Sequence, residues 1–204
     1  MNKDKNKDLK QRKIGITGGI ACGKSTIANY ISKRKEINIL DADRFTKLFL
    51  EPESNSYKEI ISHFGSNIIL HSSPKKEIDT AALKKIIFSQ DKERIWVENL
   101  LHPLIKEKMK YECEKLKHKR ILILLIPLLF EAQFNDLCSE IWLIKCSRDN
   151  QKKRLMKRDN LDEKEADKII NIQNNLIEKE KISDVILNTD GPQFKWKRLI
   201  NNLI

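Results

Sequence analysis

The sequence predicts an α/β fold in which a five-stranded parallel sheet is flanked by helices. A glycine-rich segment at residues 18–25 (GGIACGKS) follows a short apolar run and precedes an amphipathic helical pattern, which together predict the strand, loop and helix of a phosphate-binding loop. Residues 120–126 (RILILLI) form a nearly unbroken apolar run, as expected of a strand buried on both faces of a parallel sheet. Three further short apolar runs complete the five predicted strands.

The composition limits the class of partner. The 204 residues, of which 40% are hydrophobic, suffice for one domain or for a domain that carries inserted lobes. The formal charge of +11 fits a polyanionic partner, either a nucleic acid or a phosphorylated small molecule. Aromatic residues are few and the Lys and Arg residues are scattered, so no platform for stacking single-stranded bases is recognisable. We therefore expect a phosphorylated small molecule and no nucleic acid.

The N-terminal segment and the cysteines bear on location. Residues 1–13 are polar and rich in Lys, which predicts a disordered basic tail and not a signal peptide. No apolar run approaches the length needed to cross a bilayer. The four cysteines form no C-x-x-C pair, which argues against a structural zinc site and for reduced thiols. We expect a cytoplasmic protein, not bound to a membrane, that is a monomer or a weak homo-oligomer.

The residue types of the glycine-rich segment explain its chemistry. The glycines bring backbone N–H groups against phosphate oxygens, at a helix N-terminus where unpaired donors and the helix dipole favour an anion. Lys24 can follow the β and γ phosphates, and the Ser25 hydroxyl is placed to ligate Mg²⁺. The sequence thus predicts binding of ATP with Mg²⁺, through Gly18, Gly19, Ile20, Ala21, Cys22, Gly23, Lys24, Ser25 and Thr26.

Two carboxylates follow the second predicted strand, residues 36–40. Asp41 and Asp43 stand at its carboxyl end, and ligands of open parallel sheets gather at this edge, where the phosphate loop also lies. One carboxylate can hold Mg²⁺, and the other can accept the proton of an attacking hydroxyl. Asp41 can equally be the N-cap of the next helix, so both interpretations of it stay open, whereas for Asp43 the chemical role is favoured.

The chain between the second and third strands is longer than a crossover helix needs. Residues 44–119 have helical patterns divided by turn signals, which predicts an inserted helical lobe that covers a second substrate. Residues 101–105 (LHPLI) are expected to end one helix and begin another, with Pro103 in the first turn. His102 is a candidate contact of that substrate, although a His beside a Pro more often caps or packs.

Two arginines follow the fourth predicted strand, residues 141–146. Arg154 and Arg158 are four residues apart and share a helix face, from which their guanidinium groups can hold phosphate oxygens in paired bonds. This pattern predicts a lid that closes on a transferring phosphoryl group. Glu131, which follows the third strand, could contact a metal-bound water or a phosphate-binding Arg, or form a surface ion pair.

The C-terminal third supplies the remaining elements. Asp162 and Glu165 have the spacing of a capping box. Gln173 falls on the apolar stripe of the helix that follows, where a polar side chain needs a backbone or ligand partner. Residues 184–187 predict the fifth strand, and a terminal helix is expected from about Gln193.

Motifs outside the phosphate loop resemble one family. Asp-Ala-Asp, His-Pro-Leu-Ile and Pro-Leu-Leu-Phe-Glu occur in an order that resembles the bacterial dephospho-coenzyme A (dephospho-CoA) kinases. The likeness spans residues 14 to about 191 and includes residues 17–20, 23–26, 41–43, 63–65, 87–88, 102–105, 127–131, 153–154, 158–159, 173, 176, 178–179 and 183–187. It implies a P-loop kinase that phosphorylates the ribose 3′-hydroxyl of dephospho-CoA with ATP, in the last step of CoA synthesis.

The resemblance also implies roles for single residues. Asp43 would be the general base, with Asp41 beside the metal and the substrate. Lys24 and Arg154 would act in catalysis, and Arg154 and Arg158 would belong to a lid over ATP, residues 150–181. The acceptor would bind to the helical lobe, residues 44–119, with His102 and Gln173 as contacts. The nucleotide-binding core would comprise residues 14–43, 120–149 and 182–204.

The sequence departs from the family pattern at several positions. Ala21 and Cys22 stand where Gly and Ser are common, residues 45–47 differ after the Asp-Ala-Asp motif, and Asn174 and Asn175 replace an apolar residue and Pro. The main alternative is another P-loop small-molecule kinase, for a nucleoside monophosphate or a sugar acid. A GTP switch is disfavoured because no Asn-Lys-x-Asp motif follows the loop, and a nucleic-acid-binding ATPase would explain only the charge.

Overall fold

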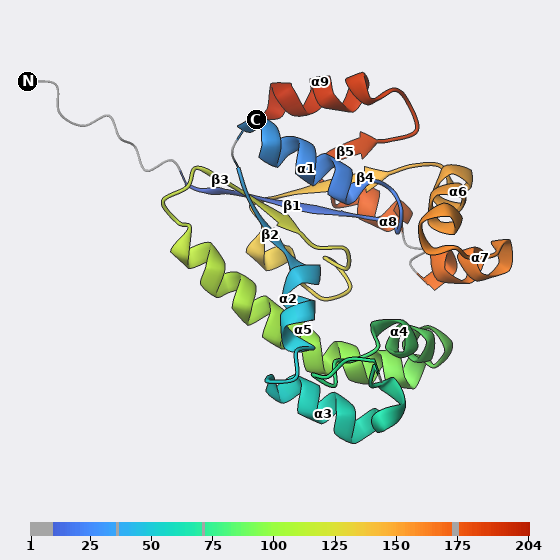
Figure 1. Cartoon of the computed structure of the whole chain (residues 1–204). Helices are drawn as coiled ribbons and strands as arrows, with labels where there is room; N and C mark the ends of the chain where they lie inside the picture. The colour runs from blue at the N-terminus through green and yellow to red at the C-terminus, as the bar shows by residue number, and fades with distance from the viewer. Residues whose placement is uncertain (1–9, 36, 71, 173–175) are drawn as a thin grey trace, which may run out of the picture. The chain divides into compact units, whose positions relative to one another are not determined.

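The computed structural model describes residues 10–35, 37–70, 72–172 and 176–204, which form two compact units (Figure 1). The sheet unit comprises the described residues as far as Leu40, together with Glu112–Ile204. The helical unit is Asp41–Tyr111. Its bounds differ from the expected lobe of residues 44–119, because its last helix continues past residue 111 into the sheet unit.

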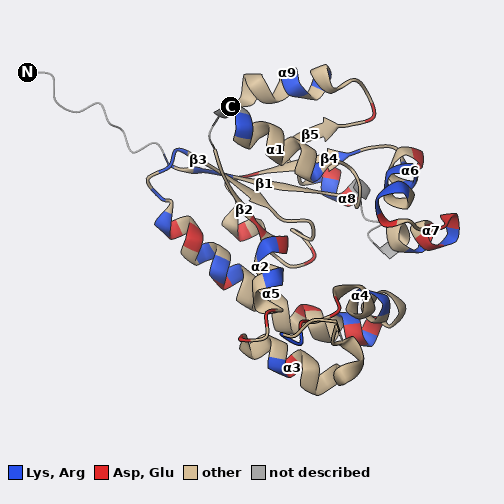
Figure 2. Ribbon diagram, in the orientation of Figure 1, with Lys and Arg blue, Asp and Glu red and all other residues tan. Residues whose placement is uncertain are grey.

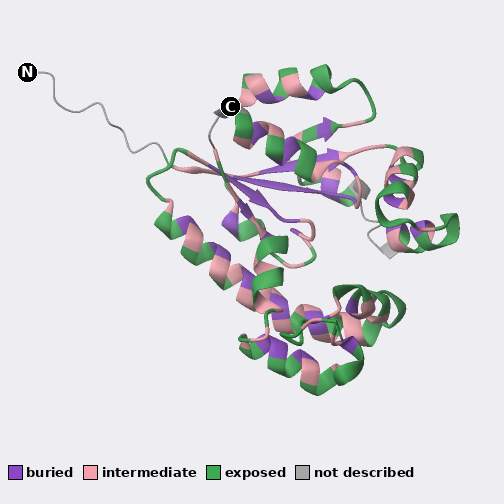
Figure 3. Cartoon of the chain, in the orientation of Figure 1, coloured by how far each residue is buried: buried purple, intermediate pink, exposed green. Residues whose placement is uncertain are grey.

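The sheet unit contains five strands in the order β2-β3-β1-β4-β5. They are β1 (Arg12–Gly18), β2 (Asn38–Asp41), β3 (Ile121–Leu125), β4 (Glu140–Lys145) and β5 (Val185–Asn188). The central strand β1 pairs in parallel with β3 and β4, and β4 pairs in parallel with β5. The predicted five-stranded parallel sheet is therefore confirmed. Figure 3 shows the central strands β3, β1 and β4 mostly buried, as their apolar runs predict, whereas the edge strands β2 and β5 are only partly buried.

Helices cover the sheet, and several of them follow the loops at the carboxyl ends of its strands. The helices of the sheet unit are α1 (Lys24–Lys35), η2 (Asn135–Leu137), α6 (Arg148–Asp159), α7 (Glu163–Ile172), α8 (Leu176–Lys181) and α9 (Gln193–Leu203). α1 and α9 pack on the sheet in one apolar cluster that includes Ile27, Ile31, Trp196 and Ile200. The predicted capping box is confirmed: Glu165 N donates to Asp162 Oδ1 (2.8 Å), and Asp162 N donates to Glu165 Oε2 (3.0 Å).

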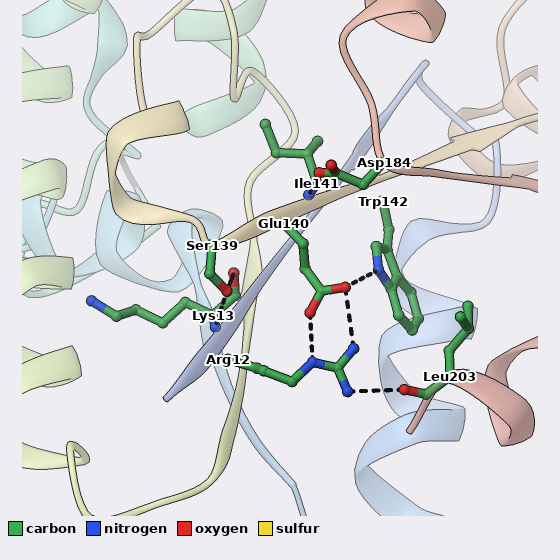
Figure 4. Close-up of polar contacts among 8 residues, drawn as sticks. All are labelled: Arg12, Lys13, Ser139, Glu140, Ile141, Trp142, Asp184 and Leu203. Atoms are coloured by element: carbon green, nitrogen blue, oxygen red, sulfur yellow. Dashed lines mark hydrogen bonds and ion pairs between the residues drawn. The ribbon is translucent and has the colours of Figure 1, made fainter. Parts of the chain in front are cut away.

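The first strand begins earlier than expected, because residues assigned to the tail have partners far along the chain. Arg12 and Lys13 open β1 and pair with β3. The Arg12 guanidinium donates to both carboxylate oxygens of Glu140 (2.7 and 3.1 Å) and to Leu203 O (2.9 Å), and Trp142 Nε1 donates to the same carboxylate (3.1 Å; Figure 4). The tail prediction is therefore wrong for these two residues, and residues 1–9 lie outside those described.

The helical unit consists of short helices and part of a long one. Its elements are α2 (Ala42–Phe49), α3 (Asn55–Phe64), η1 (Ser66–Ile68), α4 (Thr80–Ser89) and most of α5 (Asp91–Lys115). Side-chain oxygens of Asp41, Ser54 and Asp79 cap the N-termini of α2, α3 and α4. Figure 2 shows Lys and Arg spread over the helices of the chain, with both signs of charge along α5.

The long helix α5 contradicts the break expected at Pro103. α5 runs unbroken from Asp91 to Lys115 with Pro103 inside it. An interior proline costs about 3 kcal/mol, because it removes a donor and crowds the preceding turn. A buried residue nevertheless recurs at every fourth position on both sides of it, at Val97, Leu101, Ile105, Met109 and Cys113. Burial of each large apolar side chain contributes about 1.5–3 kcal/mol, so together they outweigh the proline.

Candidate functional site

The loop between β1 and α1 needs glycine at two positions for different reasons. Gly18 has a φ of 144°, and a Cβ there would lie 2.0 Å from Ile144 O of β4. Gly23 has space for a side chain, but its φ of 96° is strained for other residues. Ala21 also has a positive φ, 57°. The loop therefore has three residues of positive φ before α1 begins, a conformation of the kind in which successive N–H groups can face one anion.

The polar groups of this loop are arranged for an anion at the start of α1. Lys24 Nζ donates to Gly18 O (2.8 Å) and Gly19 O (2.9 Å), which holds its ammonium group across the loop. Ser25 and Thr26 lie exposed in the first turn of α1, and that turn contains no acidic residue. The N–H groups and the dipole at the N-terminus of α1, together with the Lys24 ammonium, all favour negative charge at this point.

Arg154 is joined to the phosphate loop through Thr189. On α6, the Arg154 guanidinium donates to Thr189 Oγ1 (2.9 Å) and Thr189 O (2.8 Å). The Thr189 hydroxyl in turn donates to Cys22 O of the loop (2.8 Å). Asp190 accepts bonds from Ser147 N at the N-terminus of α6 (2.7 and 2.9 Å), which ties that helix to the end of β5. The structure thus brings Arg154 beside the loop, although 132 residues separate Arg154 from Cys22 (154 − 22).

Arg158, the second predicted lid arginine, has a different environment. It lies exposed on α6 and its guanidinium donates twice to Asp159, at 2.7 and 2.8 Å. Its predicted contact with ATP stays a prediction.

Three residues that lie near the loop were not among the predicted site residues. Thr189 follows β5, so the rule that ligands gather at the carboxyl ends of parallel strands could have drawn attention to it. Gln151 of α6 is 3% exposed, and its Nε2 would lie 2.7 Å from a Cβ on Gly19. Cys146 follows β4, and its Sγ lies 3.4 Å from Cys22 Sγ. No local pattern marks Gln151 or Cys146, because both reach the loop only through the fold.

A hydrogen bond from Cys146 and two nearby positive charges affect the thiol of Cys22. A bond from Cys146 Sγ, and to a smaller extent the charges of Lys24 and Arg154, lower the pKa of Cys22 to about 7, although burial opposes them. A local field that stabilises a thiolate also stabilises phosphate oxygens. The electrostatics of the loop therefore agree with its geometry.

The two predicted carboxylates open the helical unit. Asp41 Oδ1 accepts a bond from Asp43 N (3.0 Å), which makes Asp41 the N-cap of α2, one of the two interpretations left open for it. Burial raises the pKa of Asp41, and the nearby charge of Asp43 raises it further. Asp43 lies exposed in the first turn of α2, so its carboxylate is accessible.

The remaining candidates lie apart from one another in the chain. His102 is half-buried in the middle of α5. Glu131 forms an ion pair with the buried ammonium of Lys179 on α8 (2.5 Å), so it pairs with a lysine as the ion-pair interpretation expected, but the partner is buried and not at the surface. Gln173 lies outside the described residues.

No helix among the described residues has the length and apolar character needed to span a bilayer. Nor do these residues contain a group of three or more His, Cys, Asp or Glu side chains arranged to hold a metal ion.

Comparisons with known proteins agree with this geometry. The family model described as dephospho-CoA kinase matches residues 12–194. A dephospho-CoA kinase of Prochlorococcus marinus subsp. pastoris is 53% identical over 195 residues, which is 96% of each chain. Among solved structures, the dephospho-CoA kinase from Campylobacter jejuni has a TM-score of 0.67 at 25% identity over 94% of each chain. A crystal structure from Thermus thermophilus has a TM-score of 0.77 at 24% identity, over 95% of this chain and 96% of that one. The predicted fold class is confirmed.

Proposed function

This chain belongs to the dephospho-CoA kinase family, and from that family we propose which of its residues bind the substrates and catalyse the reaction. The reaction is the phosphorylation of dephospho-CoA by ATP, which yields CoA and ADP, so the chain is a phosphotransferase with a hydroxyl acceptor. The family favours this acceptor over those of other P-loop small-molecule kinases. The predictions of family and reaction are confirmed. The residue roles below are proposals.

The observation that carries the proposal is the phosphate loop with Lys24 across it. We propose that the N–H groups of the loop and Lys24 bind the β and γ phosphates of ATP. On binding, the ammonium group exchanges the carbonyls of Gly18 and Gly19 for phosphate oxygens. The transition state of phosphoryl transfer is loose and spreads its charge over the equatorial oxygens, so placement and positive charge supply most of the catalysis. Arg154, with Arg158 further along the same lid, adds positive charge.

Asp43 is the proposed general base. Its exposed carboxylate would accept the proton of the ribose 3′-hydroxyl as that oxygen attacks the γ phosphorus. Asp41 supports this role through its capping bond, because the cap fixes where α2 begins and therefore where Asp43 is presented. We further propose that the helical unit binds dephospho-CoA, with His102 and Gln173 as contacts.

Hydroxyl and carboxylate oxygens are ligand types that Mg²⁺ accepts, since it prefers oxygen and keeps several waters while it binds one or two carboxylates and phosphates. The exposed Ser25 hydroxyl and the Asp41 carboxylate are the residues that would hold it. When bound, Mg²⁺ would neutralise charge on the phosphates. We also propose a monomer or weak homo-oligomer in the cytoplasm that requires no nucleic acid. The four free cysteines are consistent with a reducing compartment.

ADP release by the purified protein tests the function. With ATP and Mg²⁺, we expect dephospho-CoA to stimulate release strongly, whereas nucleoside monophosphates, gluconate and the absence of an acceptor give only background. An analogue of dephospho-CoA without the 3′-hydroxyl should bind and compete but take up no phosphate, which mass spectrometry of the products would show. Stimulation by another acceptor alone would contradict the proposal.

Thr189 is the proposed positioning residue for Arg154 and the loop. Thr189→Val keeps the volume but removes the bonds to Cys22 O and from Arg154 Nη1. Because a bond to a charged group is worth about 1.5–3 kcal/mol, we expect KM for ATP to rise about tenfold or more, with KM for dephospho-CoA little changed. Steady-state kinetics with each substrate varied measure the effect. Thr189→Ser retains the hydroxyl and is the matched control; equal damage in both variants would show that the methyl group matters instead.

A further inference from the structure

Two cysteine thiols that the kinase mechanism does not use meet at the phosphate loop. Cys22 lies within the loop with 0% exposure, and Cys146 follows the last residue of β4 and is half-buried. The Cys146 thiol donates a hydrogen bond to Cys22 Sγ, and the two sulfurs are 3.4 Å apart. The 124 residues between them along the chain make this contact a product of the sheet topology.

This distance leaves a short approach before the two sulfurs could form a bond. A disulfide requires about 2.05 Å between the sulfurs, so the thiols need to approach by about 1.4 Å. Both cysteines are free in the structure. Cys22 stands between two residues of positive φ, Ala21 and Gly23, and not within α1 or β1, so its movement would fall on the loop and not on a helix or strand.

The charges around the pair favour reaction near neutral pH. The bond from Cys146 and the charges of Lys24 and Arg154 lower the pKa of Cys22 to about 7, against the effect of burial. The same contact raises the pKa of Cys146, and Asp190 adds to that effect, so the pair shares one proton once the first is lost. The thiolate is the form that reacts with oxidants.

The other two cysteines of the chain provide an internal comparison. Burial raises the pKa of Cys113, and it raises the pKa of Cys138 to about 12. These thiols therefore stay protonated near neutral pH, and we expect them to react far more slowly with an oxidant.

We propose that Cys22 and Cys146 are an oxidation site, at which hydrogen peroxide produces a reversible disulfide that switches off nucleotide binding. The thiolate of the pair attacks one peroxide oxygen, which gives a sulfenic acid and releases hydroxide. The second thiol then attacks the sulfenic sulfur, and its proton leaves with the hydroxyl group as water. Two thiols and one peroxide give one disulfide and two waters, and a dithiol such as dithiothreitol reverses the change.

The disulfide would change the position of Cys22 in the phosphate loop, where ATP is proposed to bind. Cys22 O accepts the bond from Thr189 Oγ1 (2.8 Å), and Cys22 N donates to Gly19 O (3.3 Å), so a shift of this residue disturbs both contacts. A misplacement of 1 Å in a catalytic site can cost about a hundredfold in rate. This consequence rests on the proposed function of the loop, whereas formation of the disulfide does not.

The test begins with reduced protein from which the reductant has been removed. After exposure to hydrogen peroxide, we expect the loss of two free thiols and a cross-linked peptide pair containing Cys22 and Cys146 in a non-reducing digest. ATP binding, measured by calorimetry, and turnover should both fall by about tenfold or more and recover with dithiothreitol. A folded protein that keeps four thiols, or one that forms the disulfide and binds ATP as before, would overturn the proposal.

Two variants separate the pair from other thiols. Cys146→Ala should retain basal activity and lose its peroxide response, because it removes both the second sulfur and the bond that lowers the pKa of Cys22. Cys113→Ala, which also removes one buried thiol of the sheet unit, should respond as the unaltered protein does. Equal responses of Cys146→Ala and the unaltered protein would contradict the proposal. Failure of the proposed function would instead show as a reduced enzyme that does not phosphorylate dephospho-CoA.

Discussion

Replacement of Lys24 by Ala is expected to reduce turnover by about a thousandfold or more, to the limit of detection, because no other group can bring a mobile positive charge to the transferring phosphoryl group from inside the loop. The variant should remain folded, since the substitution removes the bonds from the ammonium group to the carbonyls of Gly18 and Gly19, and the backbone of the loop keeps its glycines. Turnover with ATP and dephospho-CoA and a thermal unfolding curve measure the two effects.

Lys33→Ala is the matched control for this change. It removes the same charge from the same helix, at an exposed position nine residues further along (33 − 24). We expect its turnover to stay within about twofold of the unaltered protein, because an exposed charge contributes little at this distance in salt. Comparable losses in both variants would show that net charge, and not contact with phosphate, accounts for the effect.

Asp43→Asn is expected to lower kcat by about two to four orders of magnitude, because an amide cannot accept the proton of the 3′-hydroxyl. ATP binding should be nearly unchanged, since Asp43 belongs to α2 and not to the phosphate loop. Asn also retains the backbone N–H that donates to Asp41, so α2 should begin at the same residue. Single-turnover kinetics together with calorimetric binding of ATP separate the chemical step from nucleotide affinity.

Substitutions of two further carboxylates of the helical unit serve as comparisons for Asp43→Asn. Asp91→Asn neutralises a carboxylate that is 84% exposed at the start of α5, and it should leave kcat unchanged. Asp41→Asn keeps a capping oxygen but loses the charge, so a raised Mg²⁺ requirement with intact folding would indicate that Asp41 holds the metal. Normal turnover in Asp43→Asn would remove that residue from the mechanism.

The thiol pair gives the phosphate loop a property that its sequence motif lacks. Cys22 puts a thiol within the loop, and because Cys146 directly follows the neighbouring strand β4, that thiol has a partner. Either cysteine alone would be an ordinary thiol without a partner for a disulfide. Their contact makes the loop a candidate for control by oxidation.

The sequence by itself determined the elements whose signals are local. Periodic apolar runs located the five strands, the glycine-rich pattern located the phosphate loop, and the spacing of Asp162 and Glu165 located the start of α7. Each of these signals depends on residues within a few positions of one another, where backbone conformation and hydrogen bonding set the outcome.

The tertiary structure decided what depends on residues far apart in the chain. α5 continues through Pro103 because buried apolar residues recur along the helix on both sides of the proline. The helix preference of the residues next to Pro103 does not reveal this burial. Thr189 and Cys146 reach Cys22 across 167 and 124 residues, because parallel strands bring their carboxyl ends to one edge. Long-range packing supplies the free energy for such contacts, and no short segment of the sequence contains both partners.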